Sequence, residues 1–416
     1  MKIAIIGSGI AGITLAHHLY KSHDITLFEA NSHIGGHTHT HEIALHGKNY
    51  AVDTGFIVFN DRTYPNFVDM LDAFKVAWQP SNMSFSVRCE KTGLEYNGTS
   101  LNSLFAQRRN LFRPSFHGMI RDILRFNQIS LVLLANGDEI KLGDYLSQNH
   151  FSQAFIRQYI VPMGAAIWST DAAQMMQFPA RFFVRFFHHH GFLTVNNRPQ
   201  WRTVTGGSAR YVEALTAPFA HKIKCGSPIE RVRRLENGVK IKPKNEEEQR
   251  FDYVFFACHS DEALSMLSDA SDLEKAILGA IPYQENSVCL HYDASLLPKR
   301  KLAWAAWNYH IPVKPINKVT VTYNMNILQN IQSPEPILIT LNHTDMINPA
   351  KVIKRLNYTH PVYTLAGVTA QGRHAEICGH NRTGYAGAYW RNGFHEDGVT
   401  SALDALQHFE AFCAKQ

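Results

Sequence analysis

The sequence predicts an α/β fold in which a doubly wound parallel sheet is interleaved with a second, α+β domain. Three observations support this prediction: a glycine-rich turn within the first 20 residues, helical patterns over residues 61–200, and short aromatic strand-like runs over residues 281–341. The chain has 416 residues, of which 45% are hydrophobic. That length exceeds one simple core and suits two domains of about 150–200 residues each.

The first twenty residues have the pattern of a nucleotide-binding strand, turn and helix. Lys2–Ile6 is a short apolar run, typical of a strand buried on both faces, and residues 10–20 supply the helix. The turn between them reads Gly7-Ser8-Gly9-Ile10-Ala11-Gly12. In this G-x-G-x-x-G pattern the first glycine permits the tight turn and the second lets backbone amides approach a pyrophosphate. The third glycine lets the helix pack closely on the strand.

A second predicted strand, at residues 25–28, leads into Glu29-Ala30, and this acid completes the nucleotide-binding pattern. Glu29 lies twenty residues after Gly9, at a position where a carboxylate accepts hydrogen bonds from a ribose hydroxyl. The combination predicts a site for the ADP half of a dinucleotide. At this point the dinucleotide is either FAD or NAD, because both present the same half to the same βαβ unit.

The sequence after Glu29 favours FAD. A second glycine pair, in Gly35-Gly36-His37-Thr38, is placed to bring backbone near a diphosphate and ribityl chain, and Asp53-Thr54-Gly55-Phe56 follows it. This order resembles the glutathione-reductase-like FAD superfamily, in particular its branch of amine oxidases, phytoene desaturases and protoporphyrinogen oxidase. In that branch an arginine normally follows the glycine pair, and His37 stands in its place here.

The middle of the chain is expected to alternate between the two domains. Residues 201–208 lead through a glycine turn into a helix at Ala209, and Asn237-Gly238 is a strong hairpin signal between two strands. Residues 251–259 read as a buried strand that returns to the first sheet. We expect an FAD-binding domain and a substrate domain with a helical lid and an antiparallel sheet. Their predicted ranges are 1–80, 205–265 and 365–416 for the first, and 81–204 and 266–364 for the second.

The C-terminal segment is expected to close the site. Residues 383–389 read as a strand, and residues 393–399 form a glycine turn before a final helix predicted over residues 400–412. The amides and positive end of that helix are suited to the electron-rich pyrimidine edge of a flavin. The alternative interpretation is a plain strand-to-helix connection. His395 is our candidate catalytic residue, because neutral imidazole exchanges protons near pH 7, and the alternative is a structural histidine.

The whole chain resembles one group within this branch. These are bacterial FAD-dependent amine-oxidase-like flavoproteins, often called predicted NAD/FAD-binding proteins and associated with cyclopropane and methyl-branched fatty acid metabolism. The most specific stretches are residues 53–60, 201–208, 303–304, 307–309 and 393–398. The resemblance implies oxidation of unsaturated or methylated acyl chains, including furan-ring formation, with FAD and oxygen.

The motifs and the resemblance together give a set of candidate cofactor-binding residues, from the diphosphate end to the pyrimidine edge, with Ile229 offering backbone to the adenine. These candidates are Gly7, Gly9, Ile10, Ala11, Gly12, Glu29, Ala30, Gly35, Gly36, His37, Thr38, Gly55, Phe56, Ile229, Ala257, Gly387, Ala388, Asp397, Gly398 and Val399. No metal site is assigned. His37, His39 and His41 alternate as ligands on one strand face would, but flavin contact already accounts for this segment.

Two departures from amine oxidases bear on the substrate. Those enzymes place a lysine at the start of a strand in the substrate sheet, and residues 284–288 contain none. Their aromatic cage precedes the last helix, where this chain has Arg391, Asn392, Gly393 and Phe394. The leading interpretation is therefore an FAD-dependent oxidoreductase acting on a lipophilic substrate, with oxygen or another electron acceptor. The alternatives are an amine oxidase and a non-redox flavin-dependent isomerase or cyclase.

A basic, apolar stretch suggests where the substrate is found. Residues 104–125 carry Arg108, Arg109, Arg113, Arg121 and Arg125 among leucine, phenylalanine and isoleucine. A helix there would fit a cytoplasmic protein in peripheral contact with the inner face of a membrane and with phospholipid acyl chains. The competing account pairs these arginines with carboxylates of the same chain and places the aromatic residues in the core. No nucleic-acid partner is expected, and the six separated cysteines indicate neither zinc nor a disulfide framework.

Overall fold

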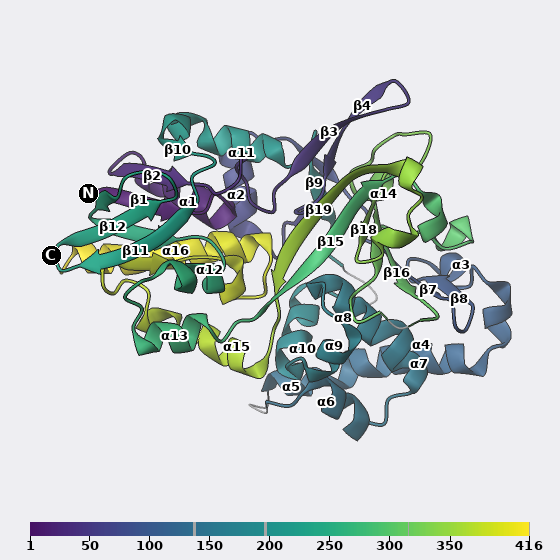
Figure 1. Ribbon diagram of the computed structural model, residues 1–416. Coiled ribbons are helices and arrows are strands. Elements are labelled where there is room, and N and C mark those ends of the chain that lie inside the picture. Colours follow the sequence, from purple (N-terminus) through teal and green to yellow (C-terminus); the bar gives the residue numbers. More distant parts are fainter. Residues whose placement is uncertain (136–138, 195–197, 315, 416) are drawn as a thin grey trace.

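The computed structural model describes residues 1–135, 139–194, 198–314 and 316–415. Figure 1 shows two halves: one contains both the purple N-terminal strands and the yellow C-terminal helix, and the other contains a long green sheet above a group of blue helices. Each half has its own large cluster of buried apolar side chains. The predicted mixed α/β architecture is confirmed, whereas the domain boundaries given above stay a prediction.

A five-stranded parallel sheet forms the centre of the first half. Its strand order is β10-β2-β1-β14-β20, so neighbouring strands come from distant parts of the chain. The bounds are β1 Lys2–Ile6, β2 Asp24–Phe28, β10 Ile223–Lys224, β14 Tyr253–Phe256 and β20 Thr383–Tyr385. Ile3, Ala4 and Ile5 are all fully buried, as expected for a strand covered on both faces.

Helices cover this sheet, and the first and last of them pack side by side. They are α1 Ile10–Leu19, α2 Pro65–Ala73, α11 Ala209–Thr216, α12 Ser260–Met266, α13 Asp272–Leu278, α15 Leu365–Gln371 and α16 His395–Cys413. The predicted start of the last helix, at residue 400, is wrong by five residues. The Asp397 carboxylate accepts a hydrogen bond of 2.9 Å from the Phe394 amide, so the capped helix already begins at His395.

A seven-stranded sheet forms the centre of the second half, with the order β19-β15-β18-β17-β16-β7-β8. The bounds are β7 Phe85–Cys89, β8 Leu94–Asn97, β15 Tyr283–His291, β16 Trp307–Ile311, β17 Val321–Asn324, β18 Leu338–Leu341 and β19 Val352–Pro361. The antiparallel sheet predicted over residues 281–341 is confirmed, apart from one parallel pair of β16 with β7. The helical prediction for residues 61–200 is wrong at residues 78–80, at β7 and at β8. Residues 78–80 and β7 pair with strands from distant segments, which override the local pattern, and β8 forms a hairpin with β7.

Short helices follow β8 and lie below this sheet (Figure 1). They are α3 Leu101–Leu104, η1 Arg108–Phe112, α4 Pro114–Ile129, α5 Val132–Ala135, α6 Leu142–Gln148, α7 Gln153–Phe155, η2 Ile156–Ile160, α8 Val161–Trp168, α9 Ala172–Gln177 and α10 Ala180–His189. The basic stretch is therefore not one helix. Arg113 has extended backbone and Pro114 is the first residue of α4, so the chain breaks between η1 and α4.

Three small sheets complete the fold. One is a hairpin of β3 Thr40–Leu45 with β4 Lys48–Asp53, another has the order β5-β9-β6, and the third is β11-β12-β13. The remaining bounds are β5 Phe59–Asn60, β6 Trp78–Pro80, β9 Trp201–Val204, β11 Ile229–Leu235, β12 Gly238–Pro243 and β13 Gln249–Phe251. The predicted Asn237-Gly238 hairpin is confirmed, because Leu235 pairs with Gly238. Among the described residues, no helix has the length and apolar character needed to cross a membrane.

Candidate cofactor and active site

The carboxyl ends of four parallel strands bring the predicted cofactor residues to one edge of the sheet. Gly7 follows β1, Glu29 follows β2, Ala257 follows β14 and Gly387 lies two residues after β20. The Ala257 amide donates a hydrogen bond of 2.8 Å to the Ile6 carbonyl, which holds the β1 and β14 ends together. Ligands of open parallel sheets bind at this edge.

The three glycines of the first turn meet different requirements. A Cβ on Gly12 would lie 1.9 Å from the Gly7 carbonyl oxygen, and Gly7 itself has a φ of +104°. A Cβ on Gly9, in contrast, would meet nothing within 4 Å. Gly7 and Gly12 are therefore required by the fold, whereas Gly9 faces open space directly before the N-terminus of α1. This is the space that a diphosphate occupies in a G-x-G-x-x-G site.

The second glycine pair packs directly against the first turn. The Gly35 amide donates to the Ser8 carbonyl at 3.0 Å, and a Cβ on Gly36 would lie 3.0 Å from the Gly9 Cα atom. The Thr38 amide in turn donates to the Gly35 carbonyl at 3.0 Å. The two predicted glycine segments therefore form one continuous backbone surface beside the open space at Gly9.

Gly55 and Phe56 pack on the same surface from the other side. A Cβ on Gly55 would lie 2.0 Å from the His37 carbonyl oxygen, and the Phe56 amide donates to that oxygen at 2.9 Å. Residues 55 and 56 therefore fix the path of the chain at His37, and only glycine fits at position 55.

Glu29 is buried at the end of β2, where the predicted ribose contact would be. Its carboxylate accepts hydrogen bonds from the Ser8 amide at 2.9 Å and from the Asn31 amide at 2.8 Å. The Ser227 amide donates to the Glu29 carbonyl at 2.9 Å, which brings the start of β11, with half-buried Ile229, alongside. Ala30 is exposed next to Glu29. The adenosine-end candidates therefore share one neighbourhood.

The C-terminal candidates lie against the N-terminus of α1. A Cβ on Gly398 would lie 2.6 Å from Ile10 Cγ2 and 3.9 Å from both the Ala11 nitrogen and the Ala388 Cβ. Val399 is 1% exposed. The Gly387 amide donates to the Ser401 hydroxyl at 2.8 Å. Two helix N-termini thus converge on one place, and their positive ends favour an anion or an electron-rich ring edge.

Asp397 lies in the first turn of α16 and is almost fully buried. Burial raises the pKa of its carboxyl to about 6, although hydrogen bonds from the Phe394 and Asn392 amides act in the opposite direction. A carboxylate at this position is suited to capping the helix. We therefore assign Asp397 to shaping the α16 N-terminus.

His395 is the first residue of α16 and is buried against an aromatic ring. Its Nε2 atom lies 2.7 Å from the Tyr211 hydroxyl, and its ring stacks on Phe56 with centroids 3.7 Å apart. Desolvation lowers the pKa of His395 to about 3. At this pKa the imidazole is neutral and a weak base near pH 7. Its participation in catalysis stays a prediction, with the neutral ring as a hydrogen-bonding group.

His37 does not share a face with the other two alternating histidines. It lies 5.3 Å from His360, ring to ring, whereas His39 stacks on His33 and His41 near β3. Its Nε2 atom is buried and has no hydrogen-bond partner in the described parts of the chain. Burial and neighbouring histidines hold its pKa well below the usual value. The described residues contain no group of three or more histidine, cysteine, aspartate or glutamate side chains arranged to hold a metal.

These features fit FAD. Gly9 leaves the space that a diphosphate would fill, two helices point their N-termini at it, and the buried Nε2 atom of His37 has an unmet hydrogen-bonding capacity. The candidates from Gly7 to Val399 would hold the group along the carboxyl edge of the parallel sheet. Their roles toward FAD stay a prediction.

The family model of flavin containing amine oxidoreductases matches residues 10–334. The chain belongs to this family. Its members are FAD-dependent oxidoreductases, and FAD is the cofactor that membership implies. The group of bacterial fatty-acid-modifying flavoproteins, a finer assignment, stays a prediction.

Individual relatives of this family member are distant. An L-amino-acid oxidase of Siganus canaliculatus is 22% identical over 331 residues, which cover 70% of this chain and 55% of that protein. The chain thus spans little more than half the length of this curated relative. Cyclohexylamine oxidase from Brevibacterium oxydans IH-35A has a TM-score of 0.70 at 14% identity, covering 98% and 99% of the two chains. The fatty acid isomerase from P. acnes that produces CLA has a TM-score of 0.68 at 18% identity, covering 98% of each chain.

A buried polar cluster in the seven-stranded sheet lies beside His37 and was not predicted from the sequence. The Asn286 side chain on β15 lies 3.0 Å from His360 Nδ1 on β19, and the Asn342 amide donates to Asn286 at 2.7 Å. Asn286 is fully buried in the stretch that lacks the lysine of amine oxidases. Burial and His259 lower the pKa of His360 to about 4. No local sequence motif marks these residues, because β15 and β19 are far apart in the chain and meet only when they pair in the sheet.

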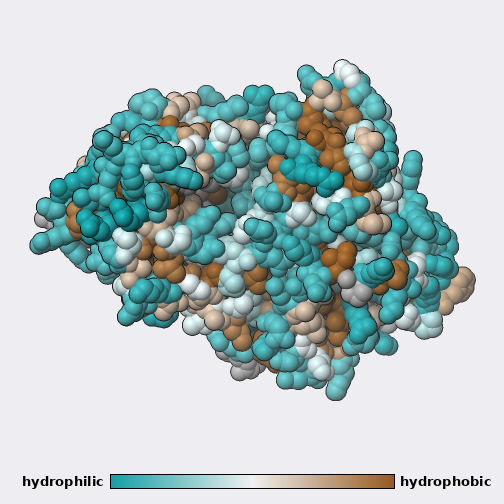
Figure 2. Space-filling view, in the orientation of Figure 1, coloured by the Kyte–Doolittle hydropathy of each residue, from teal (hydrophilic) through white to brown (hydrophobic). Residues whose placement is uncertain are grey.

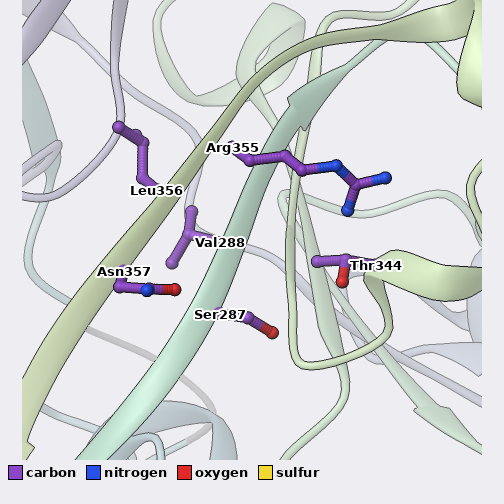
Figure 3. A pocket seen from close by; sticks show the side chains of 6 residues that line it. All are labelled: Ser287, Val288, Thr344, Arg355, Leu356 and Asn357. Atoms are coloured by element: carbon purple, nitrogen blue, oxygen red, sulfur yellow. The ribbon is translucent and has the colours of Figure 1, made fainter.

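A pocket of about 240 Å³ on the same sheet lies apart from this flavin site. It is lined by Ser287, Val288, Thr344, Arg355, Leu356 and Asn357. Figure 3 shows the Arg355 guanidinium extended toward Thr344, with Ser287 and Asn357 beside each other on neighbouring strands. None of the predicted cofactor residues lines it, so we do not assign it to FAD.

Proposed function

We propose that this family member is an FAD-dependent oxidoreductase that acts on a lipophilic substrate, an unsaturated or methylated fatty acyl chain. The observation that carries the proposal is an aromatic wall against the segment that enters α16. We define the aromatic wall as Trp168, Phe182, Phe186, Tyr363 and Phe394. An apolar wall beside the cofactor site selects an apolar substrate.

The aromatic wall is a continuous packed surface. Phe186 stacks on Phe394 with centroids 4.8 Å apart, and Phe182 stacks on Tyr363 at 4.9 Å. The Trp168 indole N–H donates to the Asn392 carbonyl at 3.2 Å, which fixes the wall to the segment before α16. Rings from α8 and α10 therefore pack against the segment that enters α16.

One polar atom of the aromatic wall has no partner. The Tyr363 hydroxyl is buried, and it makes no hydrogen bond to any described residue. A Cβ on Gly393 would lie 2.4 Å from that hydroxyl oxygen, so only a glycine backbone allows the ring its position. Because an unpartnered buried hydroxyl is costly, we assign it as the donor to a polar end or bond of the substrate.

The features of amine recognition are different here. The stretch in which amine oxidases carry their lysine contains buried Asn286 here. The Asn286 side chain forms hydrogen bonds with His360 and Asn342. Residues 391–394 replace the aromatic cage with one phenylalanine, Phe394, stacked on Phe186. Both departures support a substrate other than an amine, although several relatives are amine oxidases.

The proposed reaction removes two electrons and two protons from the acyl chain. FAD held along the carboxyl edge of the parallel sheet would supply the two-electron oxidation, and oxygen as the final acceptor would leave as hydrogen peroxide. The aromatic wall excludes water and orients the chain, and the Tyr363 hydroxyl positions it. The fatty acid isomerase of P. acnes has a similar fold, which supports the compatibility of this fold with such substrates.

The test uses the purified, FAD-loaded protein with three panels: unsaturated or methylated fatty acids and their phospholipids, primary amines, and L-amino acids. Oxygen uptake and peroxide are recorded, and products are identified by mass spectrometry. Oxidation of an acyl substrate alone supports the proposal. Peroxide formed only with amines or amino acids identifies an amine oxidase, and acyl double-bond movement without oxygen uptake identifies an isomerase. Either result overturns the proposal.

A further inference from the structure

Two segments far apart in the chain form one basic, apolar surface. Glu95 accepts hydrogen bonds from the Lys299 amide at 2.9 Å and the Arg300 amide at 3.3 Å, while its own amide donates to Gln107 at 3.1 Å. This places residues 299–302 beside α3 and η1. Sequence analysis identified only one of these two segments.

Large apolar side chains project from this surface into solvent. Phe112 is 86% exposed and Leu101 is 77% exposed, and Leu111 and Leu302 are each more than 40% exposed. In Figure 2 an apolar group projects from the right-hand margin, at the end of the molecule where Figure 1 draws α3, β7 and β8. We call these four residues and the neighbouring cations the basic apolar face.

Most cations of this face have no carboxylate in ion-pair range among the described residues. They are Arg108, Arg109, Arg113, Lys299, Arg300 and Lys301. Arg108 donates to the Phe105 carbonyl at 2.9 Å, Arg109 to the Gly93 carbonyl, and Arg113 to the Thr92 carbonyl at 3.3 Å. Among the described residues, only Arg300 of these six has a carboxylate in ion-pair range, that of buried Glu95 at 3.6 Å.

The basic stretch, residues 104–125, was expected either to contact a membrane or to join the core with its arginines paired to carboxylates. Phe116 is 2% exposed and belongs to the core, and the Arg125 guanidinium lies 3.4 Å from the Asp122 carboxylate, as the competing account required. Leu111 and Phe112, however, are exposed and do not belong to the core. The described residues give Arg108, Arg109 and Arg113 no carboxylate in ion-pair range. Backbone carbonyls hold the guanidinium groups in place while their positive charge remains directed to solvent. A surface that combines fixed cations with projecting phenylalanine and leucine is suited to an anionic lipid bilayer.

We propose that the basic apolar face docks the protein on an anionic membrane, with Phe112 and Leu101 entering the acyl boundary and the cations meeting lipid phosphates. The occupant is a lipid surface, because a purely polyanionic partner would make no use of the exposed apolar side chains. Each cation near an anionic leaflet strengthens binding about fivefold, so the six together support weak, reversible and salt-sensitive attachment. This inference does not depend on acyl oxidation, since docking is measured without turnover.

The experiment sediments the FAD-loaded protein with vesicles of phosphatidylcholine alone or of phosphatidylcholine with phosphatidylglycerol. We expect binding to the anionic vesicles only, and at least tenfold weaker binding in 0.5 M salt. The R108A/R109A/R113A variant and the K299A/K301A variant should each bind at least tenfold more weakly. The matched control, K21A/K48A/K75A, removes three positive charges that lie outside the basic apolar face and should bind as the wild type does.

A second variant separates lipid from other polyanions. L101S/F112S retains every cation and removes no buried group, so it should fold, keep its flavin absorbance and lose vesicle binding. Equal recovery of the wild type in the supernatant with both vesicle types would overturn the proposal. So would retention of binding by L101S/F112S, or equal losses in the lysine control. Acyl oxidation of detergent-dispersed substrate without vesicle binding would leave the proposed function standing and remove only this inference.

Discussion

The Nε2 atom of His395 and the hydroxyl oxygen of Tyr211 lie 2.7 Å apart, and this contact joins the first turn of α16 to α11. The same hydroxyl contacts the Thr38 side chain, just after the second glycine pair. A polar chain therefore links three segments of the candidate site. Desolvation lowers the pKa of His395 to about 3, so the neutral ring takes part in this chain at every pH near 7.

The buried neutral state of His395 predicts acid sensitivity. Its folded-state pKa of about 3 lies below the ordinary value of 6.5, so between these values the unfolded chain binds a proton that the folded protein does not. The free energy of unfolding should therefore fall by up to about 1.4 kcal/mol per pH unit as the pH decreases from 6.5 toward 3. H395Q should show a shallower slope in denaturant titrations over this range. H221Q, at an exposed histidine, is the control, and an equal slope in H395Q and the wild type would contradict the prediction.

The two outer glycines of the first turn should respond differently from the middle one. G12A should not fold, because its Cβ would lie 1.9 Å from the Gly7 carbonyl oxygen. G9V should fold and purify without FAD, since its side chain would enter the open space expected to hold the diphosphate. Circular dichroism and flavin absorbance separate the two outcomes, and G118A, on the surface of α4, is the control. A folded, fully yellow G9V protein would remove Gly9 from the cofactor site.

A buried ion pair should stabilise the sheet edge that carries the C-terminal candidates. Arg234 on β11 pairs with Glu274 on α13, and the Tyr385 hydroxyl on β20 donates to Glu274 at 2.7 Å. Burial alone would raise the pKa of Glu274, but hydrogen bonds from Arg234, Tyr385 and Ser271 outweigh it and lower the pKa to about 2.

This folded-state pKa lies below the ordinary 4.5, so the contribution of Glu274 is present above pH 4.5 and is lost as the pH falls toward 2. E274Q should lower the free energy of unfolding at pH 7 by about 3 kcal/mol, because buried Arg234 then keeps only the partly exposed Asp269 carboxylate, 3.1 Å away, as a counter-charge. E213Q, in an exposed ion pair with Arg210, should cost less than about 1 kcal/mol. A small effect of E274Q in chemical denaturation would show that the pair is replaceable.

The Tyr363 hydroxyl should serve the substrate and not the fold. Y363F removes a buried unpartnered hydroxyl, so the free energy of unfolding should rise by about 1 kcal/mol. The same change should raise KM for the acyl substrate about tenfold, because the substrate loses its donor. Y292F, whose hydroxyl donates to the Ala350 carbonyl on the far side of the sheet, should change neither KM nor FAD content. A less stable Y363F protein with unchanged KM would show that the hydroxyl has a partner in the protein.

The part of the site encoded locally was predictable, and the part made by long-range pairing was not. The turn of Gly7 and Gly9 carries its requirements in six adjacent residues, so its structure followed from the sequence. β7 and β8 were assigned to a helical region, because β7 is held by β16, more than two hundred residues away, and β8 joins the sheet only through β7. His360 and Asn286 face each other only through the pairing of β15 with β19, and neither residue has a local motif.

The close packing of α1 against α16 has a consequence for biosynthesis. β1 emerges first from the ribosome, yet its neighbour β14 begins at Tyr253 and the helix that packs on α1 begins at His395. At roughly 5–20 residues per second, the apolar strand waits tens of seconds for its last partner. The packing of α1 against α16 therefore forms only after almost the whole chain has been synthesised.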